Sequence, residues 1–242
     1  MNFRLLSVLI FICLVAFFIQ SSCVKKPVSD KERLTGQFNY KSDSDFIKLP
    51  MKYATKEIYL RKTVFEKFKA MADSAAKDGI VLKALSGTRS YAEQKNIWDN
   101  KWNNYFKNGD SIGTMKKILL YSSMPSTSRH HWGTDIDINS LEPSYFSSGK
   151  GLKEYTWLVN NAPSFGFCQV YDDMKKTGRT GYQEEKWHWS YLPLSTKFLS
   201  EYHAKISYAD IKGFKGSNLA QKINFIPSFV DGISNKCKSP SK

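Results

Sequence analysis

The chain has 242 residues, of which 41% are hydrophobic and 14% aromatic, and it carries a formal net charge of +14 at pH 7. This much apolar sequence is enough for a substantial core and excludes a globally disordered chain, so we expect one main domain with appendages. The basic excess suits anionic polymers such as cell walls or lipid headgroups, but the lysines are scattered and carry little functional weight.

The N-terminal residues have the layout of an export signal. Arg4 precedes an apolar run at residues 5–19, and small polar residues follow. The run is shorter than the roughly 20 residues of a membrane-spanning helix, which favours a cleaved signal at residues 1–22 over a retained anchor. Cys23 follows two serines as at a bacterial lipoprotein cleavage site, although Gln20 stands where that motif has an aliphatic residue.

Two alternatives therefore stay open for Cys23, namely lipidation and ordinary cleavage nearby. Either one predicts an exported protein of the periplasm or cell envelope, attached to the membrane in the first case. Export argues against nucleic acid as a partner.

The segment at residues 23–45 is polar and lacks an apolar period, and we interpret it as a flexible tether. The main domain is predicted over residues 46–200. From Glu57 its first element is expected to be an amphipathic helix that ends at Gly79, because apolar residues recur at steps of three and four. These residues are Val64, Phe68, Met71, Ala72 and Ala75.

The next elements are a strand at residues 80–87 and two helices. Ser90 and Glu93 stand three residues apart in the pattern of a capping box, so a helix is expected from there through residue 106. A shorter helix is expected at residues 114–122.

Strict alternation predicts a strand at residues 134–139, with alternate polar residues on one face and the apolar core on the other. The polar residues are Asp135, Asp137 and Asn139.

The rest of the domain is expected to contain a helix over 152–167 and strands over 167–171 and 186–191. From Pro193 we expect one or two helices and a tail, with residues 201–242 as a C-terminal helical extension. Because helices and strands are mixed without a regular βαβ alternation, the predicted fold class is α+β, with a small antiparallel sheet flanked by helices.

Once the signal segment and Cys23 are set aside, the remaining cysteines are Cys168 and Cys237. In an exported protein such a pair is compatible with one disulfide, and two free thiols are the alternative.

Three residues have the types that a catalytic zinc ion takes as ligands while a fourth position stays open, namely His130, Asp137 and His188. Gly133 permits the turn between the first two. Glu185, three residues before His188, is near enough to act as a general base. Since positions three apart face opposite sides of a regular strand, either Glu185 precedes the strand or a bulge redirects it.

The same residues also have a structural interpretation. Histidines beside tryptophans are often core polar groups, and the carboxylates of the strand would suit a solvated face. Asp135 is alternatively expected to orient a ligand by a hydrogen bond. Trp187 and Trp189 are expected on the face opposite His188, and His131 is interpreted as structural.

Three separated motifs resemble those of the D-alanyl-D-alanine carboxypeptidase family typified by VanY. The segment SRHHWGTDID matches that family's Ser-x-His-x(6)-Asp pattern, EKWHW matches its Glu-x-x-His segment, and SGTRSYAEQ is similar to its third signature. The motifs occur in the family's order, and the resemblance covers residues 57–195.

The resemblance implies a zinc peptidase fold shared with the Hedgehog amino-terminal domain, and activity on peptidoglycan stem peptides. It implies that His130, Asp137 and His188 bind zinc, that Glu185 is the catalytic base, and that Arg89 stabilises the substrate oxyanion.

Ser128 and Gln94 are the expected substrate contacts. One departure is visible, because Asp135 stands where the family usually has alanine.

The sequence thus predicts a zinc carboxypeptidase that removes the terminal D-alanine from peptidoglycan stem peptides. The alternatives within the same machinery are an L,D-carboxypeptidase, a D,D-dipeptidase and an endopeptidase. A non-catalytic wall-binding module with structural zinc is the alternative from another class.

Overall fold

The computed structural model describes residues 27–238. The predicted signal at 1–22 and the candidate lipidation site Cys23 lie outside this range. Within it, no helix is both long enough and apolar enough to span a bilayer.

The fold mixes helices with short strands, and it is α+β as predicted. The helices are α1 (Asp30–Thr35), α2 (Lys62–Lys77), α3 (Tyr91–Tyr105), α4 (Ser111–Ile118), α5 (Gly149–Asn161), α6 (Met174–Thr177) and α7 (Leu192–Lys205). The strands are β1 (Phe46–Lys48), β2 (Tyr59–Arg61), β3 (Ala84–Ser86), β4 (Asp135–Ile138), β5 (Phe167–Gln169) and β6 (His188–Tyr191).

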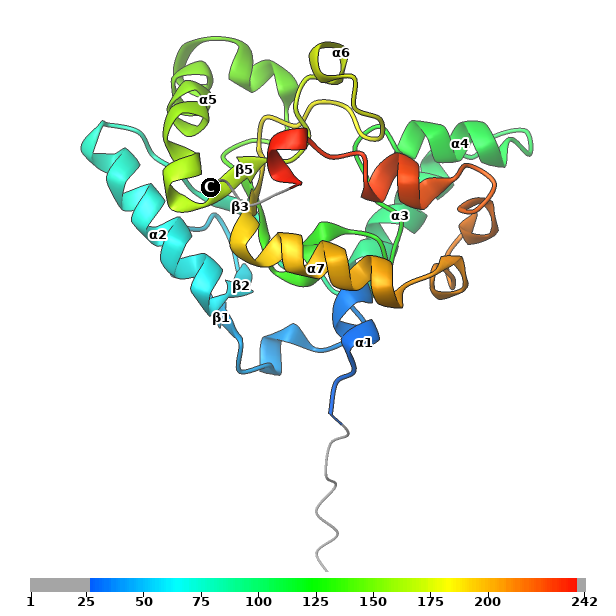
Figure 1. The fold of residues 1–242 in the computed structure, drawn as a ribbon. Coiled ribbons are helices and arrows are strands. Elements are labelled where there is room, and N and C mark those ends of the chain that lie inside the picture. The colour runs from blue at the N-terminus through cyan, green and yellow to red at the C-terminus, as the bar shows by residue number, and fades with distance from the viewer. Residues whose placement is uncertain (1–26, 239–242) are drawn as a thin grey trace, which may run out of the picture.

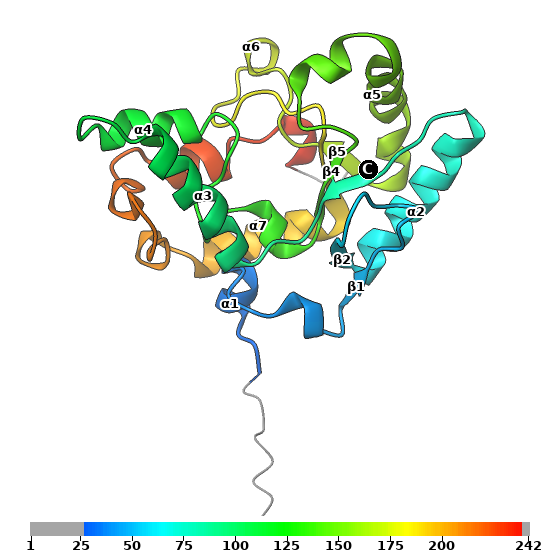
Figure 2. The same ribbon diagram turned by 180° about the vertical axis from the view of Figure 1, so that it is seen from behind.

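An antiparallel sheet with strand order β3–β4–β6–β5 forms the centre of the described residues, and β1 pairs separately with β2. Ribbons of α2 and α5 lie on one side of this sheet and α3 and α4 on the other, while α7 runs across the molecule (Figure 1). Figure 2 shows the same division from behind. Helices therefore lie to both sides of the sheet, and its apolar face packs against α2 and α5.

The alternation predicted for the strand at 134–139 is confirmed. Ile136 and Ile138 are fully buried in the core cluster that includes residues of α2 and α5. Asp135 and Asp137 alternate with them, so they face the opposite side of the sheet. Asn139 lies beyond the end of β4, in a left-handed conformation with φ of 63°.

Local signals explain where α2 and α3 begin and end. The capping box predicted for α3 is present, because the Ser90 hydroxyl accepts from the Glu93 amide and the Glu93 carboxylate accepts from the Ser90 amide. Helix α2 buries the predicted apolar residues but begins only at Lys62, since Tyr59–Arg61 pairs with β1 instead.

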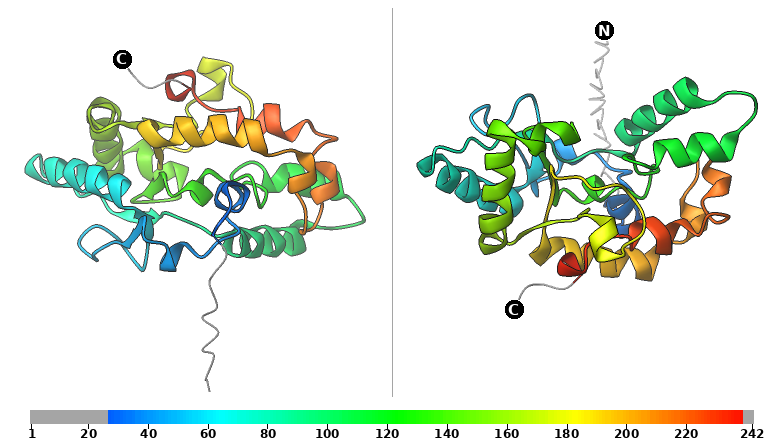
Figure 3. Two further views of the ribbon diagram at one scale, coloured as in Figure 1. Left: turned by 60° about the horizontal axis from the view of Figure 1, so that its bottom comes forward. Right: turned by 90° about the horizontal axis from the view of Figure 1, so that it is seen from above.

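The segment predicted as a flexible tether, residues 23–45, is packed against the domain over its described part. Helix α1 lies beside α7 (Figure 3). Its Leu34 is fully buried, and the Leu34 carbonyl accepts from the Trp132 indole at 3.2 Å. Gly36 follows at φ +73°, where a Cβ would lie 2.3 Å from His131 Nδ1. The prediction of a tether was wrong from α1 onward, because Leu34, which belongs to no periodic apolar pattern, is buried against the domain.

The C-terminal part packs into a second hydrophobic cluster, which also contains Trp98 and Trp102 of α3 and Trp132. Helix α7 runs across the predicted division at residue 200 and ends at Lys205, and short helical turns follow instead of a second long helix. Phe214 packs edge-on against Trp98 of α3 with ring centroids 5.6 Å apart. Cys237 is disulfide-bonded to Cys168 of β5, so the pair is bridged.

Candidate active site

Pairing of β4 with β6 brings the predicted metal ligands together. In the register of these strands Asp137 stands opposite His188, and the turn at Arg129–Trp132 before β4 adds His130. Asp137 Oδ1 lies 3.2 Å from His188 Nδ1, and Asp137 Oδ2 lies 3.4 Å from His130 Nε2. One ligand atom from each of the three residues lies within 4.8 Å of the others. All three side chains are buried.

Each imidazole donates a hydrogen bond from the ring nitrogen that points away from the candidate ligand cluster. Its other nitrogen faces Asp137. His130 Nδ1 donates to the Gly87 carbonyl at 2.7 Å, and His188 Nε2 donates to Asp135 Oδ1 at 3.0 Å. Such outer partners fix the ring orientation of metal-binding histidines. His130 Nε2 and Asp137 Oδ1 are buried without a hydrogen-bond partner. These orphaned atoms and the His/Asp/His donor set fit a divalent cation such as zinc.

The electrostatics of the group also favour a cation. Burial lowers the pKa of His130 and so keeps it neutral, as a ligand must be. Burial opposes the charge on Asp137, but His130 and His188 hold the pKa of its carboxyl well below its usual value. Burial likewise opposes protonation of His188, yet the nearby carboxylates of Asp135, Asp137 and Glu185 raise its pKa well above the ordinary value. The acidic side chains around these residues therefore favour a positive charge at this place, as a bound dication would supply.

Glu185 precedes β6, which resolves the geometric alternative left by the sequence. A turn in which the His188 amide donates to the Glu185 carbonyl at 3.2 Å brings Glu185 Oε2 to 3.4 Å from His188 Nδ1. Burial raises the pKa of Glu185. Trp189 packs in the core as predicted, whereas Trp187, which lies before the strand, lines the cavity instead of the opposite face.

Arg89 lies at the edge of the group, held by the helix that follows it. Its Nη1 donates to Gln94 Oε1 at 2.7 Å, and its Nη2 lies 3.6 Å from Asp137 Oδ2. Gln94 is fully buried, and its Nε2 donates to the Ser123 carbonyl at 2.8 Å. This geometry favours Gln94 as a support for Arg89 over the substrate contact predicted from sequence.

A cavity of about 840 Å³ opens onto these residues. His130, Asp137, Glu185, His188 and Arg89 all line it, as does Ser128. Its walls include residues that the sequence did not single out for function, namely Lys101, Tyr121, Ser122, Tyr171, Tyr182 and Trp187. The sequence could have indicated Lys101, because it follows Glu93 and Ile97 at four-residue steps and so lies on the same side of α3, which faces the cavity.

Comparison with known proteins identifies the family. The sequence profile of VanY, D-alanyl-D-alanine carboxypeptidase, matches residues 57–194, more than half of the chain. The chain belongs to this family of peptidases, which act on D-Ala-D-Ala peptides of peptidoglycan. The resemblance noted in the sequence is thus confirmed.

Two curated relatives agree with this assignment. A putative carboxypeptidase, YodJ, of Bacillus subtilis is 33% identical over 140 residues, which cover 55% of this chain and 46% of the relative. A D-alanyl-D-alanine carboxypeptidase of Enterococcus faecalis is 33% identical over 121 residues, which cover 50% of this chain and 43% of the relative. The chain therefore spans less than half the length of these two relatives.

Solved structures confirm the Hedgehog/D-Ala-D-Ala peptidase-like fold. A mutant of the vancomycin-resistance D,D-pentapeptidase VanY, solved in complex with Zn(II), gives a TM-score of 0.50 at 23% identity and covers 69% of this chain and 88% of that chain. The LD-carboxypeptidase LdcB gives a TM-score of 0.50 at 25% identity, with 78% of this chain and 76% of that chain covered.

Proposed function

We propose that this protein is a zinc-dependent carboxypeptidase that removes the terminal D-alanine from peptidoglycan stem peptides. The observation that carries the proposal is the convergence of the buried side chains of His130, Asp137 and His188 with Glu185 in the wall of one cavity. A structural metal site needs no acid beside it, so Glu185 argues against a non-catalytic module.

In this proposal His130 Nε2, Asp137 and His188 Nδ1 would hold the zinc ion. When bound, zinc supplies Lewis-acid chemistry, which lowers the pKa of water and polarises a carbonyl. Glu185 accepts the proton of the attacking water and returns it to the leaving amine, and its burial within the cavity suits a base of raised pKa.

Arg89 serves as the donor to the carbonyl oxygen as negative charge develops there. Its backbone is fixed by donation from the Arg89 amide to the His130 carbonyl at 3.1 Å, and its side chain by Gln94. Ser128 lines the same cavity and is proposed as a substrate contact.

An L,D-carboxypeptidase is the second candidate, because the LD-carboxypeptidase LdcB shares the fold at a TM-score of 0.50. We further propose that the protein is exported to the periplasm or cell envelope, with lipidation of Cys23 as the means of membrane attachment.

The test is digestion of defined tetrapeptide and pentapeptide muropeptides by the purified protein, with the products weighed by mass spectrometry and chelator-treated protein as the control. Loss of one D-alanine from the pentapeptide is expected. Cleavage of the tetrapeptide alone would favour the L,D-carboxypeptidase, and release of D-alanine from neither would refute the proposal.

A further inference from the structure

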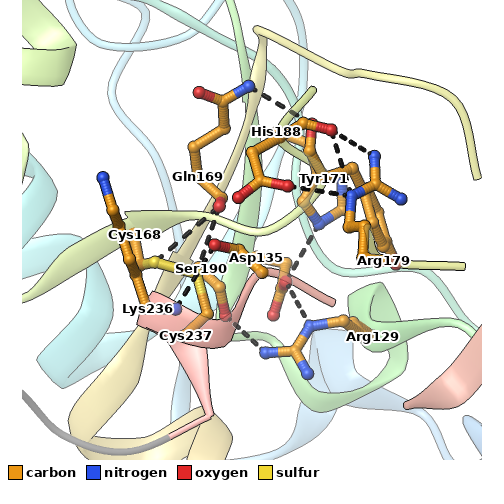
Figure 4. The surroundings of a disulfide bond; sticks show 12 residues. Arg129, Asp135, Cys168, Gln169, Tyr171, Arg179, His188, Ser190, Lys236 and Cys237 are labelled. Carbon is orange, nitrogen blue, oxygen red and sulfur yellow. Dashed lines mark hydrogen bonds and ion pairs between the residues drawn. A yellow bond between two sulfur atoms is a disulfide. The ribbon is translucent and has the colours of Figure 1, made fainter. Parts of the chain in front are cut away.

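Asp135 occupies the position at which the family resemblance expects alanine, and its side chain has no exposed surface. Its Oδ1 accepts from His188 Nε2 at 3.0 Å and from Arg129 Nε at 3.0 Å. Figure 4 shows Asp135 between these two side chains. The carboxylate thus contacts the far nitrogen of His188, opposite the nitrogen that faces the candidate ligands.

Further buried groups hold this arrangement in place. Arg129 is only 4% exposed, and its Nη2 donates to Ser190 Oγ at 2.8 Å. Ser190 is fully buried and stands opposite Asp135 in the register of β4 and β6. The Thr134 hydroxyl donates to Asp135 Oδ2. His188 is thus fixed by the sheet, and Arg129 by the turn before β4 and by Ser190.

A buried ion pair is costly to desolvate and by itself contributes little to stability. Because the Arg129 guanidinium neutralises the Asp135 carboxylate, the pair adds almost no net charge near the candidate cation site. What it does provide is an acceptor for His188 Nε2–H in a defined direction. For His130 the Gly87 carbonyl of the backbone is the acceptor, whereas for His188 the acceptor is the side chain of Asp135.

We propose that Asp135, held by Arg129 and Ser190, is a positioning residue that fixes the ring orientation and tautomer of His188, so that Nδ1 is presented to the metal ion. This inference rests on the proposed zinc dependence. Outer hydrogen-bond partners of this kind typically contribute 10- to 100-fold, as an order of magnitude, to metal affinity.

The experiment compares two double variants that both remove the ion pair. Asp135→Ala with Arg129→Met restores the family's alanine and leaves His188 Nε2 without an acceptor. Asp135→Asn with Arg129→Met keeps a neutral acceptor. We expect the alanine variant to bind zinc roughly 10- to 100-fold more weakly than the unchanged protein, and the asparagine variant to recover most of that loss. Zinc affinity is measured by competition with a chromophoric chelator, and thermal melting checks that both variants fold.

A second measurement needs no variant. In the zinc-loaded, ¹⁵N-labelled protein, the imidazole nitrogen shifts should place the remaining proton of His188 on Nε2, with slowed exchange against solvent. A proton on Nδ1 would overturn the inference, as would equal zinc affinity of the two double variants.

These outcomes are separable from failure of the proposed function. Should the unchanged protein bind zinc and cleave stem peptides while both double variants bind zinc as tightly, only the role of Asp135 is refuted. Absence of zinc binding by the unchanged protein would refute both.

Discussion

We predict that the buried imidazole of His131 makes the stability of this protein sensitive to acid. The imidazole is fully buried beneath Gly36, and its Nδ1 donates to the Arg89 carbonyl at 2.7 Å. Burial lowers the pKa of His131 from the ordinary 6.5 to about 3, with further lowering by the charge of Arg89 and opposition from the hydrogen bond to the Arg89 carbonyl. The folded protein therefore keeps this side chain neutral at pH values where the unfolded chain protonates it.

Proton linkage determines whether the free energy of unfolding rises or falls with pH. Above pH 6.5 both states are neutral at His131 and its full contribution to stability is present. As the pH falls from 6.5 towards 3, the unfolded chain binds a proton that the folded protein does not bind, so unfolding becomes easier. Each pH unit in this window removes about 1.4 kcal/mol from the free energy of unfolding, or about 2 kcal/mol by pH 5. That is a considerable part of the roughly 5–15 kcal/mol typical of a folded domain.

The assay is urea unfolding at pH 7, 6 and 5, followed by tryptophan fluorescence, for the unchanged protein and for His131→Asn. The asparagine keeps an N–H donor near the Arg89 carbonyl but does not titrate. We expect the loss of stability between pH 7 and 5 to be smaller in the variant by about 2 kcal/mol. Identical losses in the two proteins would contradict the assignment of His131 as a buried neutral group.

Three further predictions concern the chemistry, the disulfide and the cavity wall. Glu185→Gln should lower kcat for D-alanine release by roughly 10²- to 10⁴-fold while zinc is still bound, and a variant as fast as the unchanged protein would remove Glu185 from the mechanism. Replacing Cys168 and Cys237 together by serine opens a bridge across 69 positions, and it should lower the free energy of unfolding by about 4 kcal/mol in urea titrations; an unchanged midpoint and slope would show that the bridge does not form. Lys101 lines the cavity and donates to Ser122 Oγ at 2.5 Å, with no acid at ion-pair distance among residues 27–238, so Lys101→Met should raise KM for acid-terminated peptides about tenfold. An unchanged KM, measured alongside an unchanged zinc content, would exclude Lys101 from substrate binding.

The parts of the fold that were predictable are those with a local signal. The capping box at Ser90 and Glu93 placed the start of α3, and alternation placed β4 with its apolar and acidic faces. By contrast, docking of α1 depends on Leu34 meeting Trp132, which is about a hundred positions away. No period in the sequence marks such a contact.

The site, too, was predictable only in part. Residue types and the family resemblance selected His130, Asp137 and His188, whereas their approach depends on the β4–β6 register, which spacing alone does not determine. The same register places Ser190 opposite Asp135 and so completes a network that the sequence does not reveal. The position of Trp187 was predicted wrongly because the strand begins at His188, two residues later than expected.

The central claim is that the chain binds one zinc ion through His130, Asp137 of β4 and His188 of β6. The most direct measurement is metal content per chain, determined by inductively coupled plasma mass spectrometry after exhaustive dialysis against zinc-free buffer. We predict one zinc per chain in the unchanged protein and almost none in His188→Ala or in His130→Ala. The account would be contradicted if the unchanged protein, reloaded with zinc and dialysed again, retained no metal. It would also be contradicted if His188→Ala retained a full equivalent of zinc.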